Sequence, residues 1–234
     1  MFRNVFLAGA LALGAATAGA VPVTLAKLTG LTGGTLANTG VYKADLSSIG
    51  LATILSVSIS DNSSGLGGAP GQFSGFDLDA IKLSTTDCAD AACASAAAGL
   101  SLFDFISGTN FTPGLQRAPA DAKLFGTDAA GTAVDNLVAT LGLFDGESTT
   151  AIPGAFGFLS MGDNGVIDFN LTAAASTAGL FVYIGEVGDN GEVAASNIAV
   201  RDTTVPEPGT LALVALALGA LFVRSQASGR TNRR

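Results

Sequence analysis

The residues of this sequence with the clearest chemical potential are acidic side chains near predicted strands and turns. Asp77 and Asp79 lie at i and i+2 in an alternating stretch, so on a strand their carboxylates project from one face, about 6.6 to 6.8 Å apart. Further oxygen ligands stand in or beside turn sequences: Asp61-Asn62, Asp163-Asn164, and Glu186, Asp189 and Asn190. Ca²⁺ prefers such oxygen ligands. The sequence therefore predicts a calcium site drawn from Asp77, Asp79, Glu186 and Asp189, with solvated turns and strand faces as the alternative.

The same carboxylates allow a second interpretation, a secreted hydrolase. Glycosidases hold two carboxyl groups about 5 to 5.5 Å apart when they retain configuration and about 6.5 to 9.5 Å apart when they invert it, so Asp77 with Asp79 or Asp163 would fit. Aromatic content counts against this interpretation, because sugar clefts usually offer aromatic platforms. The chain has no Trp and only two Tyr, Tyr42 and Tyr183, which also limits a glycan-binding role.

Histidine is absent from the sequence, and its absence excludes several chemistries. There can be no Ser-His-Asp or Cys-His nucleophile, no histidine general base and no His-ligated transition metal. A phosphate-binding GxxxxGKS or GxxxxGKT loop does not occur, and Gly185-Glu186-Val187-Gly188 lacks the spacing of a dinucleotide-binding fingerprint. Calcium is therefore the only cofactor that the sequence suggests.

Short alternating strands separated by Gly, Asn and Asp turns dominate the middle of the chain. In Thr53–Ser60, apolar and polar residues alternate as half-buried antiparallel strands require. Turn sequences such as Asp163-Asn164-Gly165 and Asp189-Asn190-Gly191 separate the strands. The predicted strands are Val41–Leu46, Thr53–Ser60, Phe73–Ser84, Leu100–Ile106, Gly154–Leu159, Val166–Thr172, Leu180–Val187 and Val193–Arg201.

Two segments depart from the strand pattern. The sequence Thr132-Ala133-Val134-Asp135 is similar to a capping box, and the apolar residues that begin there recur at helical spacing, although this stretch could also serve as a strand. Ala91–Ala98 is an alanine-rich turn or helical fragment. No repeat, charge block or linker divides residues 21–204. We therefore predict one all-β domain, an antiparallel, jelly-roll-like β-sandwich with at most one short helix.

The N-terminus has the parts of a secretory signal peptide. Arg3 precedes an apolar segment from Val5 to Ala16, and Ala18-Gly19-Ala20 places small residues where a signal peptidase reads. We expect cleavage after Ala20, so that residues 1–20 form the signal peptide.

The C-terminus combines three parts in order: Val205-Pro206-Glu207-Pro208-Gly209, an apolar run from Thr210 to Val223, and a tail with four arginines. As a helix, the roughly fourteen residues of the run reach only about 21 Å, less than the ~30 Å hydrocarbon core of a bilayer. A short insert followed by arginines is more typical of a processing signal than of a permanent anchor, and the arginines predict a cytoplasmic tail.

These three parts resemble the PEP-CTERM sorting signal of Gram-negative bacteria, the substrate class of exosortase. The resemblance covers residues 205–234 and implies that Val205, Pro206, Glu207, Pro208 and Gly209 form the sorting and processing site of an exosortase-type enzyme. It further implies that segment 210–223 enters the inner membrane only transiently. Delivery would be to the cell surface or to the exopolysaccharide matrix of a biofilm. A plain single-pass anchor is the alternative.

Three segments of the middle region are also similar to segments that recur in uncharacterised exported PEP-CTERM proteins: Ser74–Ile81, Leu159–Gly165 and Leu180–Asp189. This weaker resemblance implies a shared module and assigns no catalytic residue.

Export changes what the charge and the cysteines imply. Arg3 and the four tail arginines belong to the two signals, as does Glu207, so the region between them holds 6 of the 11 basic and 18 of the 19 acidic residues, a net charge near −12. This balance disfavours nucleic acid and anionic membranes as partners. In an exported chain Cys88 and Cys93 should form a disulfide, whose small loop should stabilise by less than ~3 kcal/mol.

Taken with the missing catalytic motifs, these features predict a non-enzymatic structural or glycan-binding protein of the cell surface or matrix. Extracellular polysaccharide is then a partner, and the paired-carboxylate hydrolase is the alternative. A self-assembling subunit that uses edge strands such as Val193–Arg201 is a third class.

Overall fold

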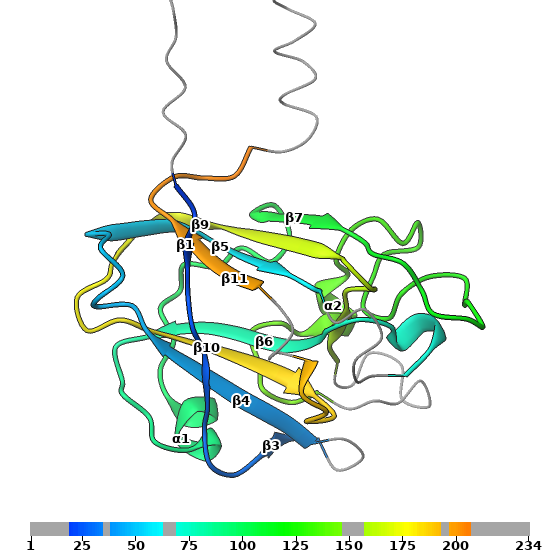
Figure 1. Ribbon diagram of the computed structural model, residues 1–234, viewed down its shortest axis with the longest axis horizontal. Coiled ribbons are helices and arrows are strands. Elements are labelled where there is room, and N and C mark those ends of the chain that lie inside the picture. Colours follow the sequence, from blue (N-terminus) through cyan, green and yellow to red (C-terminus); the bar gives the residue numbers. More distant parts are fainter. Residues whose placement is uncertain (1–18, 35–37, 63–68, 147–156, 193–196, 207–234) are drawn as a thin grey trace, which may run out of the picture.

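Two antiparallel β-sheets packed as a sandwich form the domain (Figure 1), which confirms the predicted fold class. The structure, a computed structural model, describes residues 19–34, 38–62, 69–146, 157–192 and 197–206. Sheet A has the strand order β1-β11-β5-β9-β7, with bounds Val21–Pro22, Asn197–Arg201, Thr53–Ser60, Val166–Ser176 and Thr109–Thr112. Sheet B has the order β2-β4-β10-β6-β8, with bounds Ala26–Lys27, Asn38–Asp45, Phe181–Val187, Asp77–Ser84 and Leu159–Ser160; β3 (Thr32–Gly33) also pairs with β4.

From β4 to β11, each strand that the structure describes lies in the sheet opposite the strand before it. The turn sequences between these strands therefore connect one sheet to the other. Asp189 and Gly191, both with positive φ, lie in the crossing from β10 to β11. Strands that pair come from distant parts of the chain: Val21 at the start of β1 faces Val200 of β11.

Strand β5 has the predicted bounds, but two other predicted strands were wrong in part. Strand β6 begins only at Asp77, because a 3₁₀ turn (η1, Gly71–Phe73) and Gly75, with φ of 76°, precede it. Leu100–Ile106 is a run of turns whose Phe103 makes a single bridge to Leu171. The carboxylate of Asp104 accepts hydrogen bonds from the backbone N–H groups of Ile106 and Ser107, and this local turn replaces a ladder.

Two other strand predictions reach beyond the described residues. Of Gly154–Leu159, residues 154–156 lie outside them, and β8 holds only Leu159 and Ser160. Of Val193–Arg201, residues 193–196 lie outside them, and β11 begins at Asn197.

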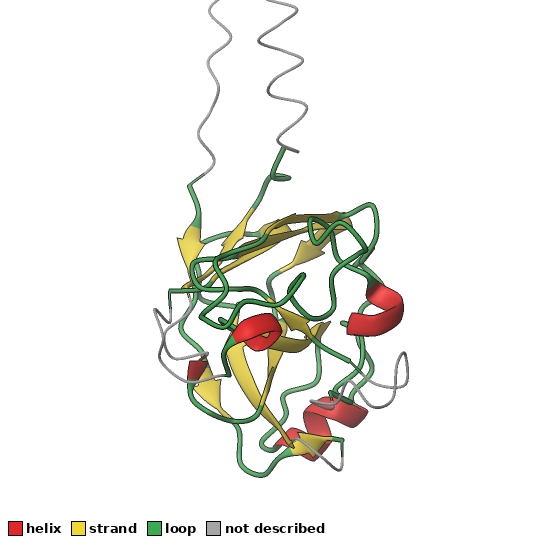
Figure 2. Ribbon diagram, turned by 90° about the vertical axis from the view of Figure 1, so that its right-hand side faces the viewer, coloured by secondary structure: helices red, strands yellow, loops and turns green. Residues whose placement is uncertain are grey.

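The helices of the described residues lie outside the sheets and are short (Figure 2); they include α1, Ala91–Ala96, and α2, Asn136–Ala139, where at most one was expected. The predicted capping box at Thr132 was wrong. Asp135 is the N-cap of α2 and accepts from the N–H of Leu137, whereas the N–H of Thr132 donates to Asp128. The side chain of Asp128 thus forms a separate turn before the helix begins.

Apolar side chains from both sheets fill the space between them, and those that are almost fully buried include Ile54, Ile59, Leu78, Ile81, Phe169 and Ile184. Because side chains alternate along a strand, Val41, Ala80 and Tyr183 point to the opposite face of sheet B. There they pack against Leu28, Phe144 and α1 in a second apolar cluster. The outer face of sheet B is therefore also covered.

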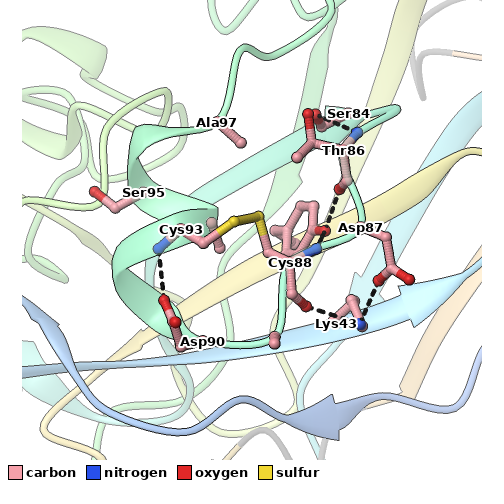
Figure 3. The surroundings of a disulfide bond; sticks show 12 residues. Lys43, Ser84, Thr86, Asp87, Cys88, Asp90, Cys93, Ser95 and Ala97 are labelled. Carbon is pink, nitrogen blue, oxygen red and sulfur yellow. Dashed lines mark hydrogen bonds and ion pairs between the residues drawn. A yellow bond between two sulfur atoms is a disulfide. The ribbon is translucent and has the colours of Figure 1, made fainter.

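The disulfide holds this second cluster in place (Figure 3). Cys88 and Cys93 are bonded, as predicted, with their Cα atoms 5.5 Å apart. The Tyr183 hydroxyl donates to the carbonyl of Thr86 at 2.5 Å and accepts from the N–H of Cys88 at 2.9 Å. At the C-terminal end of α1, Lys82 Nζ donates to the carbonyls of Ala94, Ser95 and Ala97. The small disulfide loop thus anchors a helix on the sheet.

Candidate functional site

Buried acidic side chains gather at one end of the sandwich, which we call the acidic end and define by Asp77, Asp163, Glu186 and Glu192 together with Arg117. Glu192 Oε2 accepts from the backbone N–H of Asp77 at 3.3 Å, and Asp77 Oδ1 accepts from the Ser160 hydroxyl at 2.5 Å. Glu186 and Glu192 are fully buried and Asp77 is 6% exposed. Strand β6 and the segment that follows β10 therefore bring together Asp77 and Glu192, which are 115 residues apart in the chain.

One arginine lies between two of these carboxylates. Arg117 Nε is 3.1 Å from Asp163 Oδ1, and its Nη2 is 3.6 Å from Glu192 Oε1. The backbone of Arg117 is fixed as well, because its N–H donates to the Ser74 hydroxyl at 2.8 Å. A single cation thus offsets only part of the negative charge of the acidic end.

Gly75, Gly114 and Gly162 allow the backbone segments of the acidic end to approach one another closely. A Cβ on Gly75 would lie 2.3 Å from the carbonyl carbon of Gly162, and one on Gly114 would lie 2.4 Å from the Asp163 carbonyl oxygen. The close contacts are accompanied by backbone hydrogen bonds from Gly162 to Ser74 and from Gly114 to Met161. Any side chain at these positions would separate the loop carrying Asp163 from the loop carrying Arg117.

Burial makes the acidic end hold protons near neutral pH. It raises the pKa of Glu186 to about 8 and that of Glu192 to about 7, and the pKa of Asp77 is also raised well above its ordinary value. Repulsion within the cluster adds to the effect, since the charge of Glu192 raises the pKa values of both Asp77 and Glu186. Glu186 Oε1 accepts from the N–H of Asn190, but Oε2 is buried without a hydrogen-bond partner among the described residues.

The other two residues of the predicted calcium site point elsewhere. Asp79 Oδ2 accepts from the Thr39 hydroxyl at 2.5 Å across Gly185, where a Cβ would lie 3.1 Å from Asp79 Cβ. Burial, and to a lesser degree the charge of Asp145, raises the pKa of Asp79 to about 7. Asp189 forms an ion pair with Lys27, whose side chain is 44% exposed. The four residues therefore do not converge on one point.

No group of three or more metal-binding side chains is arranged to hold an ion within the part of the chain that the structure describes. The calcium site thus remains a prediction without support from the arrangement of the carboxylates. Sequence reasoning missed Arg117 and Glu192. Arg117 could have been noticed as one of only 6 basic residues between the two signals.

The three segments of the weaker resemblance meet at this end. Ser74–Ile81 supplies Asp77, Leu159–Gly165 supplies Ser160 and Asp163, and Leu180–Asp189 supplies Glu186. These three segments therefore contribute to the packing around the buried acids of this chain.

The predicted signal peptide and the C-terminal sorting sequence both adjoin strands of sheet A. Strand β1 begins at Val21, directly after the predicted cleavage position Ala20, while Ala18 lies outside the described residues. Val205 and Pro206 are described, whereas Glu207, Pro208, Gly209 and the apolar run lie outside. Among the helices of the described residues, none has the length and hydrophobicity to cross a membrane.

Comparison with known proteins identifies one feature. Residues 204–226 match the PEP-CTERM protein-sorting motif, so the C-terminus carries this signal. The motif implies an exported, cell-surface-associated protein that exosortase processes at its C-terminus. Neither a curated protein nor a solved structure matches the chain.

Proposed function

We propose that the domain between the signal peptide and the PEP-CTERM signal is a non-enzymatic structural or glycan-binding component of the cell surface or its exopolysaccharide matrix. This proposal rests on one observation: the carboxylates of the acidic end and of Asp79, which could otherwise act in catalysis, are almost all buried. Asp79, Glu186 and Glu192 are fully buried, and Asp77 is nearly so.

A general acid, general base or nucleophile must come within hydrogen-bond reach of its substrate. Asp77 instead accepts a hydrogen bond from Ser160, and Asp79 accepts one from Thr39. Asp163 is the more accessible partner, with a side chain 17% exposed, but it is engaged with Arg117. These contacts favour a role of the acids in holding the fold over the alternative of a paired-carboxylate hydrolase.

If the domain binds glycans, one cleft of the described residues is a candidate binding surface. A cleft of about 400 Å³ opens beside residues 97–105 and is lined in part by Leu100, Phe103 and Phe105. The rings of Phe103 and Phe105 stack with centroids 5.5 Å apart. Aromatic rings at an open cleft are the feature that sugar binding uses, although the sequence as a whole is poor in Trp and Tyr.

The experiment incubates the purified exported form with exopolysaccharide from the cells that secrete it, and measures both co-sedimentation and new reducing ends. We expect co-sedimentation without hydrolysis, and Phe105→Ala should weaken the co-sedimentation of a glycan-binding domain. Release of reducing ends by the wild type, lost in an Asp77→Asn variant that still melts cooperatively, would establish the hydrolase instead.

A further inference from the structure

The chain does not leave the domain where its last strand ends. After β11, the carbonyl of Thr203 accepts from the Ser56 hydroxyl at 2.8 Å. The N–H of Val205 donates to Asn170 Oδ1 at 2.7 Å, and the Val205 carbonyl accepts from Asn170 Nδ2 at 2.9 Å and from Asn110 Nδ2 at 3.1 Å. Three hydrogen bonds therefore fix the residue that immediately precedes the Pro-Glu-Pro sequence.

The two asparagines are suited to this task by their chemistry and position. An asparagine amide carries both a donor and an acceptor, so Asn170 can satisfy the N–H and the carbonyl of the same residue, as a neighbouring strand would. Asn170 lies on β9 and Asn110 on the adjacent β7 at the edge of sheet A. The segment from β11 to Val205 thus crosses this sheet (Figure 1) before the sorting signal begins.

We propose that Asn170 and Asn110 form a clamp on Val205 that positions the sorting signal for its processing enzyme. The proposal rests on the sorting function of the PEP-CTERM motif. The two asparagines are positioning residues: they act on the cleavage reaction through the place where the chain leaves the domain.

The clamp shortens the tether between the domain and the membrane. An extended chain spans at most about 3.3 to 3.6 Å per residue, so the six residues from Val205 to Leu211 reach about 20 Å. Without the clamp the tether would start at Arg201, the end of β11, and its ten residues would reach about 35 Å. A domain of this size has a radius of gyration of roughly 16 Å. The clamped domain is therefore held against the membrane surface, with sheet A and the processing site facing an enzyme embedded there.

A short tether also limits the conformations of the site itself. The clamp fixes Val205, and Pro206, with its own φ restricted, keeps Val205 out of the helical region, so the chain enters the scissile segment in few orientations. Restricting a tethered substrate in this way raises its effective concentration at the enzyme. Releasing Val205 should therefore slow processing without altering the sorting motif.

The test compares the wild type with Asn170→Asp and with the double variant Asn110→Ala, Asn170→Ala. Asn170→Asp keeps the side-chain shape but removes the donor to the Val205 carbonyl. Asn197→Ala, at an exposed position of the same sheet, is the matched control. In each strain, intact-mass analysis after a pulse of synthesis gives the rate at which the tail is lost, and hydrogen exchange on the purified protein reports the Val205 N–H.

We expect exchange at Val205 to rise about fivefold for each hydrogen bond lost, with processing slowed severalfold and the melting temperature of the domain unchanged. The control should match the wild type in all three measurements. Processing at the wild-type rate, or faster, in variants whose Val205 exchange has risen would overturn the proposal. A Glu207→Ala variant tests the sorting signal separately from the clamp. Normal processing of that variant would refute the assignment of the Pro-Glu-Pro sequence as the sorting signal and would leave the role of the two asparagines untouched.

Discussion

Replacing Arg117 with methionine should destabilise the folded domain by about 3 kcal/mol at pH 8. Removing one partner of a buried ion pair typically costs about 3–5 kcal/mol, because the other charge stays buried without compensation. Here the Arg117 side chain as a whole is 21% exposed, which places the expected cost at the lower end, whereas Glu192 is fully buried. Methionine keeps much of the apolar stem, so the loss reports charge more than packing.

Urea unfolding of the purified exported form at pH 8 and pH 5 measures this cost. It should shrink at pH 5, because Glu192, with its pKa raised to about 7, is then protonated and needs no cation. Arg201→Met is the matched control: Arg201 pairs with Asp168 at 3.8 Å on the partly exposed face of sheet A and should cost about 1 kcal/mol or less. Equal costs for the two arginines, or a cost at position 117 that does not depend on pH, would contradict the role assigned to the acidic end.

The wild-type domain should lose stability steadily as the pH rises from 5 to 8. Burial raises the pKa of Glu186 from 4.5 to about 8 and those of Glu192 and Asp79 to about 7, so over this window the folded state binds more protons than the unfolded state. The free energy of unfolding then falls by about 1.4 kcal/mol per pH unit for each additional bound proton. The exposed carboxyl groups of Asp45, Asp104 and Asp128 have lowered pKa values and titrate below this window.

Urea unfolding at half-unit pH steps gives the slope directly, and Glu186→Gln should flatten it by removing one titrating group. A stability that rises toward pH 8, or a slope unchanged in the variant, would refute the assignment. The same series tests the predicted calcium site: because its four carboxylates do not converge, calcium at pH 8 should raise the melting temperature no more than magnesium does. A calcium-specific rise that Asp77→Asn abolishes would restore the prediction. Equal responses to the two ions would leave these acids a role within the protein's own hydrogen bonds and ion pairs.

The sequence pattern predicted the sandwich and several strands, because apolar and polar residues alternate along a strand that buries one of its faces. Thr53–Ser60 became β5 with no change of bounds, since its isoleucines and valine fill the space between the sheets. Leu100–Ile106 failed because the Asp104 side chain offers the backbone a competing turn. A residue that caps or breaks an element can thus outweigh a favourable hydrophobic pattern.

The candidate site could be predicted only in part, because its geometry depends on which strands become neighbours. Asp77 and Glu186 do approach each other, whereas Asp79 turns toward Thr39 across the gap left by Gly185. No local signal links Arg117 to Glu192, which lie 75 positions apart in the sequence. The alternation of strands between the sheets creates these partnerships, and turn sequences alone do not show which strands become neighbours.

The pairing of β1 with β11 dictates the order of events during secretion. Val21 faces Val200, and β5 pairs with β11 and β9, so the two early strands of sheet A find their partners only in the later part of the chain. A chain that is threaded outward from its N-terminus must therefore emerge almost completely before sheet A can close. The sorting motif begins at residue 204, shortly after β11 ends at Arg201, so sheet A becomes able to close only when the sorting signal directly follows it in export.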